Sequence, residues 1–505
     1  MASDDERRTD AGDLDLYARR MPLTLTSAND GDWSVEGEER VCRMAIASTG
    51  AKAMELLLDD MAVPAGASLL LRAPNGRVLC KPMPLDLPKG VQSCSSPLAF
   101  EDSVLFEYRE PVGAHPIGRF TIDGVAHGYR FLDDVLREGD CYVNVACTPE
   151  SIGWEGPITA TVRISVVTTQ GNGWCSGTLV NNVRQDCAPY ILTAFHCGRL
   201  STNLQFSQYK FYFNFQYSAC TGGTYSLDQF LTGAQKVAYS DDYAPQYQGV
   251  GGSDFMLLRT NADIPSSFEP FWAGWDATSI LTVTADGVCI HHPASAPKKI
   301  SSYTQTLTTG HPMASSGLMT HYKVKWAPTT NGFGVTVEGS SGSGLFKPNA
   351  AVGPVLIGTL TGSSTGMSCT NNTGTAYFGK MSYHWTNNPN AANVKLNKWL
   401  DPDGTGTLVL GGSANPCASP SGIQGPEMGR SIQCSPNPAN ERLTLQLTGA
   451  ADARLLDITG RTIATWHLRP GMNELDTQTV PSGTYSIMLL PSAGPPASQR
   501  IIIAH

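Results

Sequence analysis

Apolar residues in this chain occur in short runs that are separated by Gly, Pro, Asn and Ser. Alternate side chains of residues 42–46 would face opposite sides of a sheet, and residues 55–58 and 67–71 are short, mainly aliphatic runs. The second run is followed by the turn-forming sequence Ala-Pro-Asn-Gly at residues 73–76. Strands at this spacing predict an all-β chain that begins with a β-sandwich.

The same pattern predicts further strands and one helix downstream. Residues 141–410 contain short strands with Gly, Asn and Ser turns, which fits a pair of antiparallel barrels. A helix is expected over residues 391–400, where Asp401 and Pro402 would stop it. We expect five parts: a disordered segment at 1–30, a β-sandwich at 31–140, a double β-barrel at 141–410, a flexible Pro/Gly/Ser-rich linker at 411–431 and a small C-terminal β-sandwich at 432–505.

The composition agrees with many turns and few helices. The 505 residues include 51 Gly and 33 Pro, and only 16% are charged. A net charge of −9 argues against a nucleic-acid partner, which usually requires a basic face. No apolar run reaches the roughly 18 residues of a membrane-spanning helix, so no transmembrane segment is expected.

The 13 cysteines include no C-x2-C pair, which favours disulfides over zinc and therefore an oxidising compartment. An odd number leaves at least one cysteine free or intermolecular. Residues 1–15 are polar and lack the apolar segment of a signal peptide. We expect a secreted or cell-surface protein whose export signal is missing from this sequence, rather than a cytosolic protein.

The candidate chemistry centres on the Gly/Ser-rich turn at residues 338–344, which follows a short predicted strand. A sharp turn can hold the Ser341 hydroxyl outward and direct the N–H groups of Gly339 and Ser341 to one point, as an oxyanion hole requires. Ser343 is the alternative serine, but Gly339, two residues ahead of Ser341, favours Ser341.

His196 and Asp254 are the candidate base and orienting carboxylate. An apolar strand ends at His196, and a small turn places Asp254 before another apolar strand. The order His196, Asp254, Ser341 is that of the chymotrypsin-type triad and differs from the subtilisin and α/β-hydrolase orders. In this interpretation Ser341 is the nucleophile, His196 is the general base and Asp254 fixes the imidazole tautomer.

Several segments together resemble lysyl endopeptidase, a secreted bacterial serine protease of the trypsin fold. They occur in the family's order and are residues 175–182, 192–198, 253–255, 272–276, 290–293, 339–343 and 399–402. The resemblance implies a serine endopeptidase for protein or peptide substrates, without a cofactor. It also implies that residues 31–140 are a pro-region that is cleaved somewhere in 132–140; an independent binding module is the alternative. His291-His292-Pro293 has no partner ligands at zinc spacing, so we interpret it as a structural loop of the family and expect no metal.

The resemblance further implies three disulfides, Cys141–Cys369, Cys147–Cys220 and Cys175–Cys197. For the remaining cysteines, the resemblance implies no pairing. Candidate pairs among them are Cys187–Cys289, Cys80–Cys94 and Cys417–Cys434, which leaves Cys42 over.

Residues 432–505 resemble the C-terminal sorting domain of the type IX secretion system. The matching segments include residues 436–438, 443–447, 453–458, 480–485 and 501–503. The resemblance implies recognition by the secretion machinery, after which the domain is removed or exchanged for a surface anchor. A generic accessory sandwich is the alternative.

The substrate pocket departs from the family pattern. Its expected residues are Trp326, Val335, Thr361, Thr375 and Ala376. Trp326 matches the family's aromatic wall, but Thr361 stands where the family has a His, and residues 374–376 stand where it has an Asp. A buried ammonium group without a counter-charge costs several kcal/mol, so we expect a small, neutral or apolar P1 residue instead of Lys.

A second departure is at Ser340, where trypsin-type zymogens carry a carboxylate that binds the new N-terminus. Ser340 has no charge, so removal of the pro-region is expected to act differently, by uncovering the cleft. The altered pocket leaves a catalytically weak or inactive trypsin-fold surface binding protein as the alternative function.

Overall fold

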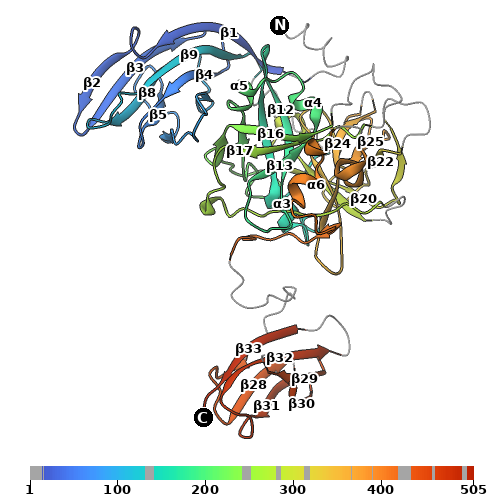
Figure 1. Cartoon of the computed structure of the whole chain (residues 1–505). Coiled ribbons are helices and arrows are strands. Elements are labelled where there is room, and N and C mark those ends of the chain that lie inside the picture. The colour runs from blue at the N-terminus through green and yellow to red at the C-terminus, as the bar shows by residue number, and fades with distance from the viewer. Residues whose placement is uncertain are drawn as a thin grey trace. The chain divides into compact units, whose positions relative to one another are not determined.

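The computed structural model describes residues 14, 16–130, 141–240, 252–279, 286–311, 319–364, 367–388, 391–418, 434–447, 449–457, 461–491 and 497–505. The chain forms two compact units, Met1–Ala418 and Ser419–His505 (Figure 1). The predicted cleavage window at residues 132–140 lies outside the described residues.

The first unit begins with a β-sandwich, drawn in blue in Figure 1. One sheet has the order β2-β3-β8-β5-β6, and the other contains β1, β9, β4 and β7. Their bounds are β1 Leu16–Thr26, β2 Asp32–Glu36, β3 Glu39–Ala47, β4 Ala53–Ala62, β5 Ser68–Arg72, β6 Met83–Pro84, β7 Cys94–Ser95, β8 Ser103–Pro111 and β9 Arg119–Gly128. The prediction of disorder over residues 1–30 is wrong from Leu16 onwards, because β1 pairs with β9 and buries Tyr17.

The sandwich continues directly into the first barrel. At its start β1 pairs with β12 (Gly171–Val180), in the register Leu16↔Gly173 and Ala18↔Asn172. One sheet therefore runs β15-β14-β11-β12-β1-β9-β4-β7 across both parts. The neighbouring interface buries an ion pair, with Lys210 Nζ 2.6 Å from Glu55 Oε1 and both side chains fully buried.

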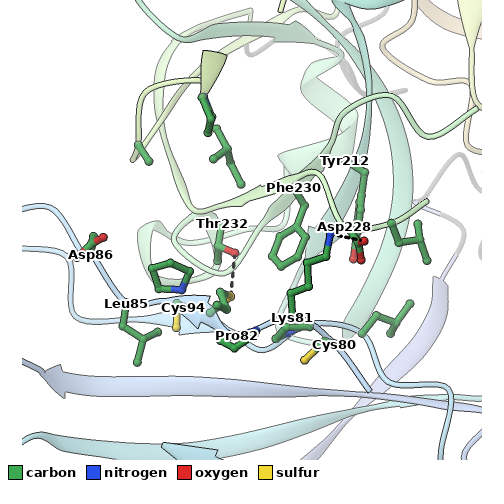
Figure 2. A pocket seen from close by; sticks show the side chains of 18 of the residues that line it. Cys80, Lys81, Pro82, Leu85, Asp86, Cys94, Tyr212, Asp228, Phe230 and Thr232 are labelled. Carbon is green, nitrogen blue, oxygen red and sulfur yellow. Dashed lines mark hydrogen bonds and ion pairs between the residues drawn. The ribbon is translucent and has the colours of Figure 1, made fainter. Parts of the chain in front are cut away.

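A pocket lies beside this interface and is lined from both parts (Figure 2). Lys81 of the sandwich and Asp228 of the first barrel form an exposed ion pair there at 2.8 Å. Cys80 and Cys94 also line the pocket and are free thiols, so the predicted Cys80–Cys94 disulfide is wrong.

Two β-sheets form the barrels. The first barrel consists of β11 Thr161–Val167, β12, β13 Tyr190–Thr193, β14 Lys210–Tyr212, β15 Phe230–Thr232, β16 Ala234–Tyr239 and β17 Met256–Thr260. The second consists of β10 Val143–Asn144, β18 Gly274–Asp276, β19 Gly287–His291, β20 Lys299–Tyr303, β21 Thr308–Gly310, β22 His321–Val324, β23 Gly344–Lys347, β24 Val355–Ser363, β25 Ala376–Lys380 and β26 Val409–Leu410. Buried side chains from both barrels, among them Leu192, Leu257, Ile290 and Leu356, form one shared core.

Among the described residues of this unit, the α-helices are short: α3 Glu155–Ala160, α4 Phe195–Gly198, α5 Asn203–Phe206 and α6 Asn397–Leu400. The prediction of one helix over residues 391–400 is wrong. A 3-10 turn at Ala392–Val394 is separated from α6 by Lys395, whose ψ of 149° is extended. The predicted linker also begins too early, because Ser413 pairs with Trp272 and Cys417 bonds to Cys187, so residues 411–418 pack on the barrels.

The second unit is a small sandwich of two sheets. Their orders are β27-β28-β31 and β30-β29-β32-β33. The bounds are β27 Cys434–Ser435, β28 Arg442–Leu447, β29 Ala451–Leu456, β30 Thr462–Leu468, β31 Gly471–Asp476, β32 Gly483–Pro491 and β33 Ala497–Ile503. Alternating buried residues such as Leu443 and Leu445 of β28 and Leu455 of β29 fill its core. In the described part of the chain, no helix has the length and apolar character needed to cross a membrane.

Candidate active site

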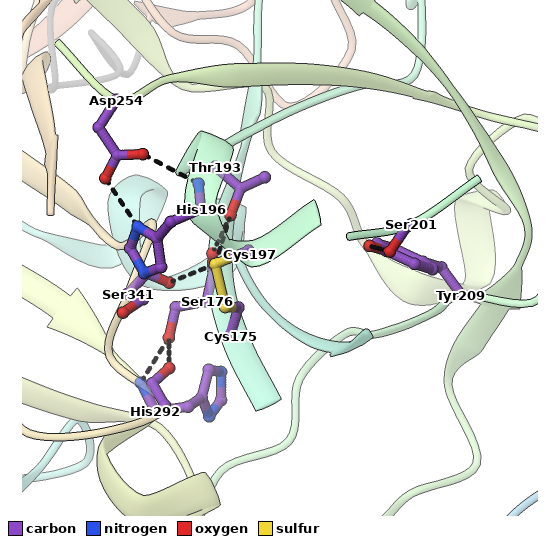
Figure 3. The surroundings of a disulfide bond; sticks show 11 residues. Cys175, Ser176, Thr193, His196, Cys197, Ser201, Tyr209, Asp254, His292 and Ser341 are labelled. Atoms are coloured by element: carbon purple, nitrogen blue, oxygen red, sulfur yellow. Dashed lines mark hydrogen bonds and ion pairs between the residues drawn. A yellow bond between two sulfur atoms is a disulfide. The ribbon is translucent and has the colours of Figure 1, made fainter. Parts of the chain in front are cut away.

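His196 and Asp254 are brought together by strand pairing. His196 lies in α4, directly after β13, and Asp254 lies two residues before β17. Thr193 of β13 pairs with Met256 of β17, so the residues just beyond this pair meet at one end of the first barrel. Asp254 Oδ2 lies 2.7 Å from His196 Nδ1, and Asp254 Oδ1 accepts the His196 backbone N–H at 2.9 Å (Figure 3).

The backbone around Asp254 is unusual. Asp254 has φ of +52°, a left-handed conformation that few non-glycine residues adopt. Its N–H donates to Ser240 Oγ at 3.1 Å, and its carbonyl accepts the Phe195 N–H at 3.2 Å. These bonds hold the carboxylate toward His196, and only 2% of the Asp254 side chain is exposed.

Ser341 lies beside the same histidine. Its carbonyl accepts the Ser176 N–H at 2.8 Å and lies 3.9 Å from Sγ of Cys197, the residue after His196. Figure 3 shows the Ser341 side chain at the edge of the His196 imidazole that faces away from Asp254. The close approach depends on Gly342, which has φ of +81°; a Cβ there would lie only 2.1 Å from Thr193 Oγ1.

The turn that carries Ser341 leaves two N–H groups available. Ser340, Gly342 and Ser343 donate to the carbonyls of Val337, Leu360 and Ser340. Within the described residues, the N–H groups of Gly339 and Ser341 donate to no protein acceptor. Two free donors on either side of Ser340 are the arrangement that an oxyanion hole needs.

The five predicted pocket residues lie in or beside the core of the second barrel. Val335, Trp326 and Ala376 belong to one buried cluster. Thr361 is buried and bonds through Oγ1 to His321 Nε2 at 2.9 Å. Thr375 is partly buried and exchanges backbone and side-chain hydrogen bonds with Ser364.

Two further hydroxyl residues, which sequence reasoning missed, lie next to the predicted pocket residues. Thr336 Oγ1 and Ser363 Oγ lie 2.7 Å apart and join the Ser341-bearing segment to the end of β24. The Trp326 indole N–H also donates to Thr336 Oγ1 at 3.3 Å. No local signal marks these residues, because the hydroxyl pair exists only once β24 lies beside the segment.

The comparisons with known proteins concern the two folded units as families. Residues 136–379 match the family model of the lysyl endopeptidase C-terminal domain. The chain contains a lysyl endopeptidase-like serine endopeptidase domain. Residues 434–504 match the family model of the secretion system C-terminal sorting domain, which indicates a secreted or cell-surface protease.

Two solved structures are similar to part of this protease. A thermostable serine protease, AL20 from an extremophilic microorganism, is 18% identical; the match covers 45% of this chain and 93% of that chain, with a TM-score of 0.32. Protease Anisep from Arthrobacter nicotinovorans is also 18% identical, with coverages of 45% and 92% and a TM-score of 0.29.

Four disulfides are present, and all of them lie in the first unit. The three expected bridges, Cys141–Cys369, Cys147–Cys220 and Cys175–Cys197, are all present. The fourth is Cys187–Cys417, so the predicted pairs Cys187–Cys289 and Cys417–Cys434 are wrong. Cys289 is instead buried in β19, 3.2 Å from the Ser343 hydroxyl, where no other cysteine reaches it.

Proposed function

We propose that the protease domain cleaves peptide bonds with Ser341 as nucleophile, His196 as general base and Asp254 as its orienting carboxylate. The contact of Asp254 with His196 beside the Ser341 turn is the observation that carries this proposal. His196 Nε2 takes the Ser341 proton as Oγ attacks the substrate carbonyl, and then protonates the leaving amine. In the second half of the reaction, His196 takes a proton from water as the water attacks the acyl-enzyme. His196 then returns this proton to Ser341 as the acid product leaves.

Asp254 and the backbone of the turn would stabilise the charges that form in this reaction. Asp254 keeps the Nδ1–H tautomer of His196 and stabilises the imidazolium. The N–H groups of Gly339 and Ser341 would bind the oxyanion of the tetrahedral intermediate, and each such donor is typically worth about 3 kcal/mol. The free state of both donors supports this role.

The proposed P1 specificity is for small, neutral or apolar side chains. Thr336 and Ser363 are hydrogen-bonded to each other, and the Trp326 indole N–H donates to Thr336 Oγ1, so little space remains between these groups. All three groups are uncharged, and Val335, the residue before Thr336, is fully buried. A Lys ammonium group here would lose its hydration without gaining a counter-charge, at a cost of several kcal/mol.

We also propose that residues 31–140, together with β1, form the pro-region and that residues 432–505 are the export address. Among the described residues, the sandwich contacts the first barrel through β11, β12, β14 and β15.

Labelling with a fluorophosphonate tests the proposed nucleophile. We expect the full chain to be labelled and Ser341→Ala to lose both labelling and peptide hydrolysis. Ser343→Ala is the matched control, because Ser343 lies in the same turn, is buried and bonds to Cys289. Absence of labelling in the folded wild-type chain would instead favour a surface binding protein.

A panel of peptides that differ only at P1 tests the specificity. We expect Ala or Val at P1 to be cleaved faster than Lys, and the double variant T336G/S363G to accept larger P1 side chains. Strong selectivity of the wild-type chain for Lys would contradict the proposed pocket.

A further inference from the structure

The turn that carries Ser341 is tied to one short segment, His291-His292-Pro293-Ala294, which we call the strap. The strap begins at the end of β19. Three consecutive residues of the turn, Glu338, Gly339 and Ser340, are each connected to it. The connected residues are the ones that set the direction of the Gly339 and Ser341 N–H groups.

Two of the connections involve the backbone. The Ala294 N–H donates to the Glu338 carbonyl at 2.7 Å. Ser176 Oγ accepts the His292 N–H at 3.0 Å and donates to the Gly339 carbonyl at 2.9 Å, so one hydroxyl bridges strap and turn. The bond to the Gly339 carbonyl fixes the peptide plane between Gly339 and Ser340, and the bond to the Glu338 carbonyl fixes the plane that carries the Gly339 N–H.

The third connection is a buried imidazole. His291 Nδ1 lies 2.8 Å from Ser340 Oγ, and His291 Nε2 lies 2.9 Å from Ser301 Oγ on β20. Ser340 Oγ also accepts the Val337 N–H at 3.3 Å. Every donor and acceptor in these three bonds has a partner when the Ser340 hydroxyl donates to His291 Nδ1 and the His291 Nε2–H donates to the Ser301 hydroxyl. His291 is fully buried, and burial, with the Lys299 charge nearby, lowers its pKa to about 3, which keeps the ring neutral.

Packing around the strap leaves the turn little freedom. Gly339 has φ of +82°, and a Cβ there would lie 2.9 Å from the His292 carbonyl oxygen. Ala294 and Ser295 hold the left-handed φ values of +46° and +61°, which cost energy in a non-glycine residue and persist only where the surroundings impose them. The Ser295 carbonyl accepts a hydrogen bond at 3.0 Å from the buried Arg163 guanidinium.

We propose that the strap, with His291 as a positioning residue, fixes the oxyanion hole of this chain from within. Trypsin-type zymogens complete this turn only when a newly released N-terminal amine binds the carboxylate before the nucleophile. Here a neutral imidazole already binds the hydroxyl at that position, Ser340. The turn is therefore formed in the unprocessed chain, and its geometry does not depend on where the chain is cut. This inference rests on the proposed nucleophile, Ser341.

The first experiment compares Ser340→Ala with Ser165→Ala, a buried serine of β11 outside the proposed catalytic machinery that bonds to Tyr17. We expect Ser340→Ala to lower kcat at least 10-fold with KM within about 2-fold, since a whole oxyanion donor is worth about 100- to 1,000-fold. Affinity for a peptidyl boronate should fall in parallel. Ser165→Ala should change the melting temperature without this kcat loss. Equal kcat losses in both variants, or none in Ser340→Ala, would overturn the proposal.

The second experiment needs no variant. The full chain is purified uncut, as verified by mass spectrometry, and its rate of fluorophosphonate labelling is compared with that of the processed chain. We expect rates within about 3-fold, and a rate at least 100-fold lower in the uncut chain would overturn the inference. Absence of labelling in both forms, or labelling that survives Ser341→Ala, would contradict the proposed function instead.

Discussion

Asp254 binds His196 through both oxygens of its carboxylate. One oxygen lies 2.7 Å from the ring nitrogen Nδ1, and the other accepts the backbone N–H of the same residue at 2.9 Å. The two bonds fix the position of the His196 backbone and the orientation of its ring together. A carboxylate that only neutralised the charge of the imidazolium would not need the bond to the His196 backbone N–H.

Asp254→Asn tests this relationship. Asn tolerates the left-handed conformation of Asp254, so the backbone should be retained, but its amide N–H2 favours the wrong imidazole tautomer. We expect kcat to fall by about 10,000-fold with little change in melting temperature. Asp286→Asn is the matched control, because Asp286 is exposed and also has a positive φ, +79°. A loss below about 10-fold in Asp254→Asn would remove Asp254 from the mechanism.

The buried ion pair between Glu55 and Lys210 should make the sandwich and the first barrel unfold together. Glu55→Gln leaves the Lys210 ammonium buried without a counter-charge, which typically costs about 3–5 kcal/mol of the free energy of unfolding. The double variant E55L/K210M should recover much of this loss, because it removes both charges. Chemical unfolding followed by tryptophan fluorescence measures both effects.

Glu101→Gln is the control for this prediction. Glu101 forms an ion pair with Arg77 at 2.6 Å, but the Arg77 side chain is 61% exposed. Exposed pairs contribute about 1 kcal/mol or less, so this change should be small. A Glu55→Gln variant as stable as Glu101→Gln would show that the interface does not depend on the ion pair.

Stability should fall as the pH is lowered from about 6.5. Four fully buried histidines, His291, His292, His321 and His384, have pKa values lowered mainly by burial, to about 3 for His291 and His384. In the unfolded chain they protonate near pH 6.5, so between pH 6.5 and about 3 the unfolded state binds more protons and acid favours it. Each such histidine contributes a slope of up to about 1.4 kcal/mol per pH unit.

Denaturant midpoints measured at pH 7, 6, 5 and 4 check this slope. His384→Gln should make the slope shallower, by up to about 1.4 kcal/mol per pH unit, because one proton-binding site of the unfolded chain is lost. The exposed His115 supplies the control, and His115→Gln should leave the slope unchanged. Constant stability between pH 7 and pH 5 would contradict the prediction.

Alkylation before and after denaturation should distinguish the buried free cysteines from the disulfide-bonded ones. Burial raises the pKa of Cys42, Cys94 and Cys289 to about 12, so these thiols should resist iodoacetamide at pH 8 in the folded chain. After denaturation without reductant, all five free cysteines, including Cys80 and Cys434, should react. A non-reducing peptide map should contain Cys187 linked to Cys417, and a Cys187–Cys289 peptide would contradict the structure.

Several features follow from the sequence because their signals are local. Alternation of side chains over two residues identifies strands such as β3 and β28, since successive residues of a strand face opposite sides. The order of His196, Asp254 and Ser341 can be read along the chain without knowing any contact. The helix expected over residues 391–400 shows the limit of such signals, because packing replaced most of it with a 3-10 turn and an extended residue.

The tertiary structure decided the features that join distant residues. Cys187 and Cys417 are 230 residues apart, and nothing in either neighbourhood favours that pair over Cys187–Cys289. The Thr336–Ser363 hydroxyl pair and the His291–Ser340 bond likewise exist only after β19, β23 and β24 have paired in register. Local propensities act over a few residues, whereas these contacts depend on which strands become neighbours, and that choice is made by the packing of the whole core.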